Sequence, residues 1–249
     1  FTFTTGEAET IYKASEVAYV PKSTSVATDE DDSRMKTFKQ GIFKFHVLDY
    51  DSKSVSVSFA GTDSTDAIVH NSILVIPGNV TYGNETYTVT EINRSGFAGY
   101  GFWEEIVIPE SVTKIGDGAF MGCMCLRKIS IPAHVNSIGS SIVANCPNLE
   151  CVIVDKNNKT YDSRDNCNAI IETGSDALIA GCYATKIPNS VVEIGDNAFL
   201  GCSEMTTVHI PNSVRSIGFR SFANCFRIKE LSLSDSLHFI HGEAFDGCS

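Results

Sequence analysis

The sequence lacks any apolar run of the roughly eighteen residues that a helix needs to cross a bilayer, so no segment is expected to span a membrane. It is also short of positive charge: 19 Lys and Arg oppose 30 Asp and Glu, the net charge is −11 at pH 7, and the basic residues form no cluster. Affinity for the phosphate backbone of nucleic acids depends on concentrated positive charge. Nucleic acid is therefore excluded as the expected partner, and an anionic membrane surface is disfavoured.

Motifs that carry catalysis or bind metal are missing as well. There is no G-x-S-x-G nucleophile elbow, and His238 and His241 form H-x-x-H without the glutamate and the helix of a zinc protease. The acidic run 29–32 lacks the glycine and the spaced oxygen ligands of a calcium loop. We therefore expect a chain that is not an enzyme and that has no metal and no cofactor.

What the chain does have is an internal repeat. The segments 110–132, 189–211 and 212–234 share one 23-residue length and align without gaps. Two apolar columns recur through the alignment. The first holds Ile92, Ile115, Ile138, Ile194, Ile217 and Ile240, and the second holds Phe97, Phe120, Val143, Phe199, Phe222 and Phe245. Neither a helix nor a strand produces a spacing of this length, whereas the stacked coils of a solenoid do.

Each coil carries the same local signals. Leu126, Ile129 and Ile131 form an L-x-x-I-x-I pattern, and its final alternation predicts a short strand with one face turned inward. Pro132 follows and ends the strand, because proline lacks the donor that a strand ladder needs. A glycine after the isoleucine column, as at Gly116, indicates a turn or a close backbone approach. Stacking such coils predicts a parallel sheet with a strand spacing of roughly 4.8 Å.

The period is absent from residues 1–86, which we interpret as a β-rich cap at the open end of the solenoid. Within it, residues 43–47 and 55–59 alternate as strands, residues near Gly83 and Asn84 form a hairpin turn, and residues 22–34 form an exposed loop. The solenoid occupies residues 87–249. A stretch at 156–188 interrupts its period, and we expect an enlarged coil with a β-hairpin that turns at Gly174 and Ser175.

The nine cysteines fall into groups with different expectations. A third repeat column holds Cys123, Cys146, Cys202, Cys225 and Cys248. One column at the coil spacing is better explained by small buried thiols that fill equivalent interior positions than by a metal or redox array. Cys167 and Cys182 differ, since a two-residue turn at Gly174 and Ser175 places them opposite each other, within reach of a disulfide. A disulfide and two unpaired thiols remain the alternatives for this pair.

The phrase IPxSVxxIGxxAFxxC, the tract DSRDNCNAIIETGSDALIAGC and the lead-in VIPGNVTYGNETYTVTEI resemble the BspA-like branch of leucine-rich-repeat proteins, over about residues 70–249. The resemblance implies a β-rich (α/β-type) leucine-rich repeat solenoid with 23-residue coils and a parallel sheet, preceded by an N-terminal β cap. It also implies an extracellular or cell-surface bacterial protein that serves in adhesion or protein binding, without catalytic residues. The chain begins at Phe1, and we expect a mature form that lacks its targeting segment.

The expected binding surface is the exposed side of the parallel sheet, because stacked strands form a continuous concave platform. Its candidate residues are Glu105, Val107, Lys128, Ser130, Cys151, Ile153, Thr207, His209, Glu230 and Ser232. This row contains no aromatic platform for stacking on sugars, so a host or neighbouring-cell protein is the expected partner. A carbohydrate-binding or sensing component and a structural spacer are the alternatives. The sequence does not indicate an oligomeric state.

Overall fold

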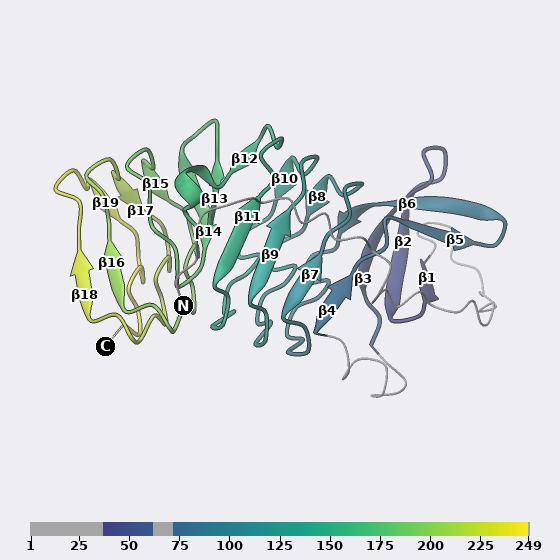
Figure 1. Cartoon of the computed structure of the whole chain (residues 1–249), viewed down its shortest axis with the longest axis horizontal. Helices are drawn as coiled ribbons and strands as arrows, with labels where there is room; N and C mark the ends of the chain where they lie inside the picture. Colours follow the sequence, from purple (N-terminus) through teal and green to yellow (C-terminus); the bar gives the residue numbers. More distant parts are fainter. Residues whose placement is uncertain (1–36, 62–71, 249) are drawn as a thin grey trace, which may run out of the picture.

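The computed structural model describes residues 37–61 and 72–248, which form an elongated stack of coils (Figure 1). Nearly all regular structure in these residues is strand, and their one helix is a single 3-10 turn, η2 (Arg164–Asn166). The predicted loop at 22–34 lies outside the described residues. The expected β-rich leucine-rich repeat solenoid is confirmed.

A regular coil contributes one strand to a front sheet and one shorter strand to a back sheet. The front strands are β4 (Ile73–Val75), β7 (Glu105–Val107), β9 (Lys128–Ile131), β11 (Cys151–Val154), β16 (Thr207–His209) and β18 (Glu230–Ser232). The back strands are β6 (Glu85–Ile92), β8 (Lys114–Ile115), β10 (Ser137–Ile138), β15 (Glu193–Ile194), β17 (Ser216–Ile217) and β19 (Phe239–Ile240). Neighbouring coils pair in parallel with equivalent residues facing each other, as Ile129 faces Val152.

The cap is an antiparallel sheet that leads directly into the back sheet. Its strands are β1 (Thr37–Gln40), β2 (Phe43–Asp49) and β3 (Ser54–Phe59). Strand β3 pairs in parallel with β6, and β5 (Asn79–Tyr82) pairs with the other end of β6 in a hairpin that projects from the body (Figure 1). The alternation predicted for these strands is confirmed, since the first, third and fifth residues of β2 are buried. This sheet therefore covers the first coil.

The solenoid begins earlier than the predicted boundary at residue 87. Strand β4 lies in the segment assigned to the cap, yet it pairs in parallel with β7 as the first strand of the front sheet. The reason is visible in residues 73–77, ILVIP, which repeat the inward alternation and the terminal proline of residues 128–132, KISIP. Leu74 and Ile76 are accordingly buried.

The enlarged coil contains β12 (Tyr161–Asp162), η2, β13 (Ala169–Glu172) and β14 (Ala177–Gly181). The predicted hairpin is present, but its loop has four residues, Thr173–Asp176, since Glu172 pairs with Ala177. Arg164 donates to both carboxylate oxygens of Asp162 (2.8 and 2.7 Å) and to Asp176 Oδ1 (2.5 Å). This guanidinium therefore joins the end of β12 to the hairpin loop.

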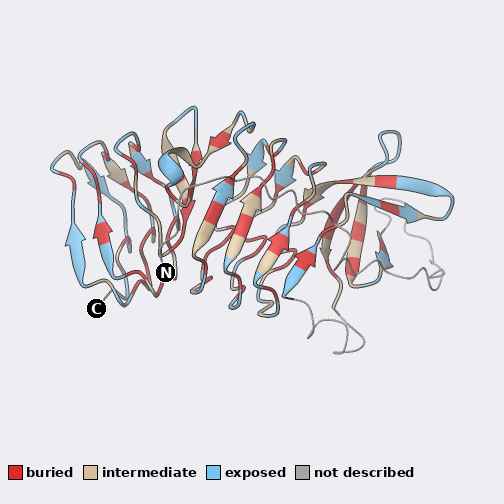
Figure 2. Ribbon diagram, viewed as in Figure 1, coloured by how far each residue is buried: buried red, intermediate tan, exposed pale blue. Residues whose placement is uncertain are grey.

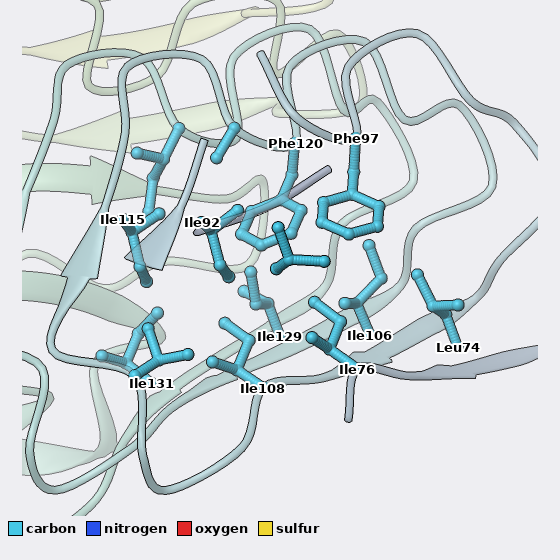
Figure 3. Packing of buried hydrophobic residues seen from close by; sticks show 14 of the residues in the cluster. Leu74, Ile76, Ile92, Phe97, Ile106, Ile108, Ile115, Phe120, Ile129 and Ile131 are labelled. Atoms are coloured by element: carbon cyan, nitrogen blue, oxygen red, sulfur yellow. The ribbon is translucent and has the colours of Figure 1, made fainter. Parts of the chain in front are cut away.

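The core consists of the predicted columns stacked in files between the two sheets (Figure 3). Ring centroids of Phe97 and Phe120 lie 6.0 Å apart, and those of Phe199 and Phe222 lie 4.8 Å apart, in stacked geometry. The inward residues of the front strands are buried from β4 to β16, whereas Leu231 of the last front strand, β18, is 43% exposed; the outward residues are accessible throughout (Figure 2). One coil could not exclude water from these side chains, so the stability of each coil depends on its neighbours.

The glycine column marks positions where adjacent coils come too close for a side chain. A Cβ on Gly218 would lie 2.6 Å from Asp196 N, and one on Gly139 would lie 2.5 Å from Asp117 N. These neighbouring atoms are backbone atoms, so they cannot move aside as a flexible side chain can. The close approach therefore contributes to the spacing of the coils, as the sequence predicted.

We predict that Gly218→Ala lowers the free energy of unfolding by about 1–3 kcal/mol, because a methyl group would be forced against the backbone of the preceding coil. Gly174→Ala is the matched control, since no atom lies within 4 Å of the corresponding Cβ. Urea unfolding followed by circular dichroism measures both changes. Equal stability of the two variants would contradict the close-approach explanation.

Candidate binding surface

The outward side chains of the front strands form one accessible surface, which we call the front face. All predicted candidates lie on it and are exposed or half-buried, namely Glu105, Val107, Lys128, Ser130, Cys151, Ile153, Thr207, His209, Glu230 and Ser232. Their side chains point away from the core because inward and outward residues alternate along each strand. The strand pattern thus places these residues where a partner can reach them.

The front face is not continuous, which corrects the expectation of one platform. The front strands form a four-stranded sheet, β11-β9-β7-β4, and a separate two-stranded sheet, β16-β18. Between them runs the last part of the enlarged coil, where Thr185 replaces the inward aliphatic residue. Its hydroxyl donates to Asn168 O (2.5 Å) and accepts from Cys182 N (2.9 Å), so this segment forms a turn instead of a strand. The face therefore has a first segment on β4–β11 and a second on β16–β18.

An aliphatic row crosses the first segment. The pairing register places Val75, Val107, Ser130 and Ile153 side by side on successive strands. Val75, Val107 and Ile153 are exposed by 44%, 40% and 42%. Exposed apolar residues are common when they are scattered singly. Here Val75 and Val107 lie side by side on adjacent strands, and Ser130 separates Val107 from Ile153. Apart from Ser130, the row presents only aliphatic side chains.

The charged residues of the first segment pair with one another across coils. Lys128 Nζ lies 2.8 Å from Glu105 Oε1, and Arg127 Nε lies 3.2 Å from Glu150 Oε1. The hydroxyl of Tyr183, from the enlarged coil, donates to the other oxygen of Glu150 (3.0 Å). Exposed ion pairs of this kind add little to stability, so their main effect is to neutralise the flank of the aliphatic row.

The second segment is polar. It presents Thr207, His209, Glu230 and Ser232, and His209 Nδ1 lies 2.5 Å from Ser232 Oγ. No aliphatic row continues here. The two segments therefore differ in the chemistry that they offer, and the apolar part of the front face is confined to β4–β11.

Two exposed residues of the first segment, Ile73 and Val75, were missed by the sequence analysis. Both lie on β4, inside the region assigned to the cap, and the pattern ILVIP was the signal that could have found them. Val75 is the β4 member of the aliphatic row, whereas Ile73 lies in register with Glu105 beside it.

The repeated thiols line the interior. Cys123, Cys146, Cys202 and Cys225 are buried and free, and Cys248 is half-buried at the end of the described chain. The thiols of Cys123, Cys146 and Cys225 donate to the carbonyls of Phe97, Phe120 and Phe199 at 3.1–3.2 Å. Each of these thiols thus adds a hydrogen bond to a carbonyl of the preceding coil, which valine or alanine could not donate. The carbonyls of Phe120 and Phe199 also accept from the amides of Cys123 and Cys202.

The register predicted for Cys167 and Cys182 is wrong by one residue. A β-bulge between Ile170 and Ile171 shifts the pairing of β13 with β14, so that Ala169 faces Gly181. Continued by one residue, this register brings Cys182 opposite Asn168, and the Cys182 thiol donates to Asn168 O (3.5 Å). Both cysteines are free and buried in the structure. The opposition on which the disulfide hypothesis rested is therefore absent.

Residues 37–61 and 72–248 contain no group of three or more His, Cys, Asp or Glu side chains arranged to hold a metal ion. In the same ranges no helix is long and apolar enough to cross a bilayer. The front face presents aliphatic groups, hydroxyls, the imidazole of His209, the half-buried thiol of Cys151 and charged side chains.

Short parallel front strands on stacked coils of 23 residues define a leucine-rich repeat solenoid with an exposed sheet face. The sequence profile of the BspA type leucine rich repeat region matches residues 90–170 and 180–249, in 6 copies. The chain therefore belongs to the family of BspA-type leucine-rich repeat proteins. These bacterial repeats typically act as scaffolds for protein interaction and not as enzymes.

Solved structures of similar fold include three bacterial proteins. The pneumococcal vaccine antigen PcpA is 19% identical, with 82% of this chain and 71% of that chain covered and a TM-score of 0.46. The T. pallidum leucine-rich repeat protein is 22% identical, with coverage of 80% and 83% and a TM-score of 0.44. A leucine-rich cell surface protein from Faecalibacterium prausnitzii is 17% identical, with coverage of 89% and 88% and a TM-score of 0.34. No curated protein sequence matches the chain.

We predict that alkylation of the native protein at pH 8 is confined to accessible thiols. Burial raises the pKa of Cys123, Cys146 and Cys225 to about 12, so only about one in ten thousand of these groups is a thiolate at that pH. Cys125 is exposed and is expected to react. Iodoacetamide labelling followed by peptide mass spectrometry measures each site, and urea-unfolded protein is the control. Native labelling of the buried thiols at the rate of Cys125 would show that their column is open to solvent.

Proposed function

We propose that this chain is a protein-binding module of a bacterial cell-surface or secreted protein, and that it engages its partner through the first segment of the front face. The observation that carries the proposal is the aliphatic row Val75, Val107 and Ile153, which lie in register on β4, β7 and β11, with Ser130 of β9 between the last two, and are exposed by 40–44%. Burying such a row removes apolar area from water, which stabilises a complex by about 25 cal/mol per Å² before the costs of association.

The surroundings of the row favour a protein partner. The cores of protein interfaces are depleted in unpaired charge, and the charges nearest to this row, Glu105 with Lys128 and Arg127 with Glu150, already neutralise each other. A partner that covers the row therefore does not have to supply counterions for these four side chains. The strands are also fixed by their ladders, so little backbone order must be gained on binding.

A protein is a better match than a carbohydrate for the front face. The outward positions of β4, β7, β9, β11, β16 and β18 carry no aromatic ring on which a sugar could stack. The proposed partner is a host or neighbouring-cell protein, which fits adhesion by a surface-exposed member of this family.

The test uses the whole chain, immobilised against a panel of purified fibronectin, laminin, collagen and fibrinogen, with a glycan array in parallel. We expect Val107→Lys combined with Ile153→Lys to weaken protein binding at least tenfold, or about 1.4 kcal/mol, since two ammonium groups would be buried against the partner. Thr207→Lys combined with Ser232→Lys adds the same charge to the second segment and is the matched control. It should change the affinity less than twofold.

Circular dichroism of both variants establishes that the coils remain folded. Loss of binding only in the control variant would place the partner on the second segment. Binding confined to the glycan array, or equal losses in both variants, would overturn the assignment of the first segment as a protein-binding surface.

A further inference from the structure

Both sheets of the solenoid stop at the same place. The front sheet breaks after β11, and the back sheet breaks after β10, since neither strand pairs with a strand of the enlarged coil or of a later coil. The six-stranded back sheet that follows starts at β12 and runs to β19. The boundary lies between residues 155 and 156, and we call it the seam.

Apart from β5, which pairs only with β6, the back sheets on the two sides of the seam have the same topology. The first runs β1-β2-β3-β6-β8-β10, and the second runs β12-β13-β14-β15-β17-β19. In each, the first two pairings are antiparallel and the next three are parallel. Strands β12, β13 and β14 therefore occupy the same position before the second run of coils as strands β1, β2 and β3 of the cap occupy before the first.

The hydrogen bonds across the seam come mainly from side chains. Tyr161 Oη accepts from Ile138 N (3.0 Å), and Ser163 Oγ accepts from Val154 N (3.0 Å). Asn158 Nδ2 donates to two carbonyls, those of residues 132 and 135, at 2.9 Å each. Apart from the turn at 155–158, one backbone–backbone bond crosses the seam within the described ranges, from Asn145 N to Leu200 O (2.7 Å).

On the other side of the enlarged coil the backbone ladder of the back sheet continues, whereas the front strand β16 pairs only with β18. Strand β14 pairs in parallel with β15, Gly181 N donates to Ala198 O (2.8 Å), and Gly195 N donates to Leu178 O (2.8 Å). The enlarged coil is thus joined by its backbone to the coils that follow it and not to those that precede it.

The hydrophobic core divides at the same hairpin. Ile170 and Ala180 pack into the core of the first coils, whereas Ala169, Ile171 and Leu178 pack into that of the later coils. The hairpin therefore presents apolar side chains on both of its faces. Packing therefore continues across the seam while the ladder does not, which makes this interface between neighbouring coils weaker than the others.

From these observations we infer that the enlarged coil is a second cap, and that the chain consists of two cooperative blocks, one before and one after the seam. In a repeat protein, the coupling between neighbours decides how far a local opening spreads. A break in the ladder lowers that coupling at one point. Each block then opens with its own free energy, and this inference does not depend on the proposed binding function.

Hydrogen exchange of the whole chain, resolved by peptide mass spectrometry, tests the inference with two matched variants. Phe120→Leu and Phe222→Leu each shorten one fully buried ring of the phenylalanine files, one on each side of the seam. We expect each substitution to speed amide exchange about tenfold in its own block and less than twofold in the other. The step should fall between β11 and β13, which lie on opposite sides of the seam.

Wild-type protein in sub-denaturing urea provides a second measurement that needs no substitution. Two groups of amides, divided at the seam, should respond to urea with different slopes, because each block exposes its own surface on opening. One common slope for β9 and β17, or a gradual decline of the substitution effect with distance and no step at the seam, would overturn the inference.

Discussion

Every coil of this protein relies on the next for a dry interior. The rings of Phe199 and Phe222 exclude water from each other at a centroid distance of 4.8 Å, and the thiol of Cys225 donates to the carbonyl of Phe199 in the coil before it. The bare backbone of Gly218 lets the two coils approach closely enough for both contacts. Hydrophobic burial, thiol–carbonyl hydrogen bonds between coils and close backbone approach thus repeat at one spacing, and none of them can exist in a single coil.

Because the inward positions carry the folding energy, the outward positions of the front strands are free to vary without loss of the fold. Their charges nevertheless follow the same spacing: Glu105 and Lys128 face each other across the ladder, and Glu204 and Arg227, which precede β16 and β18, pair at the same interval of one coil. The pairs Glu105 with Lys128 and Arg127 with Glu150 neutralise charges on the first segment. The same stacking that builds the core therefore also holds exposed aliphatic residues and paired charges in register on this segment.

Periodicity was sufficient to predict the buried columns up to the last coil, where Ile240 is exposed, the strand and proline of the regular coils, the glycine approach and the front-face positions after β4. It failed where one local choice has no periodic signature. The bulge between Ile170 and Ile171 shifts the strand register, so that Cys182 lies opposite Asn168 instead of Cys167. The hairpin that contains this bulge packs against two cores at once. Thr185 ends the front sheet through two hydrogen bonds to its own coil, although its sequence position is that of a strand residue. The start of the solenoid at β4 was predictable from ILVIP, but the lead-in hairpin obscured it.

A hairpin inside a solenoid resolves a conflict between two requirements. An interior file must remain closed to water along its whole length, yet a continuous ladder would join all coils into one rigid body. Ile170 and Leu178 lie on adjacent strands and pack into opposite cores, so the hairpin shields both cores from water. Meanwhile Tyr161, Ser163 and Asn158 satisfy backbone groups that the broken ladder would leave bare. Side-chain bonds of this kind tolerate small rotations that a ladder does not, because their torsions can adjust. The two segments of the front face consequently lie on opposite sides of the seam, so a partner that contacts both would contact both runs of coils.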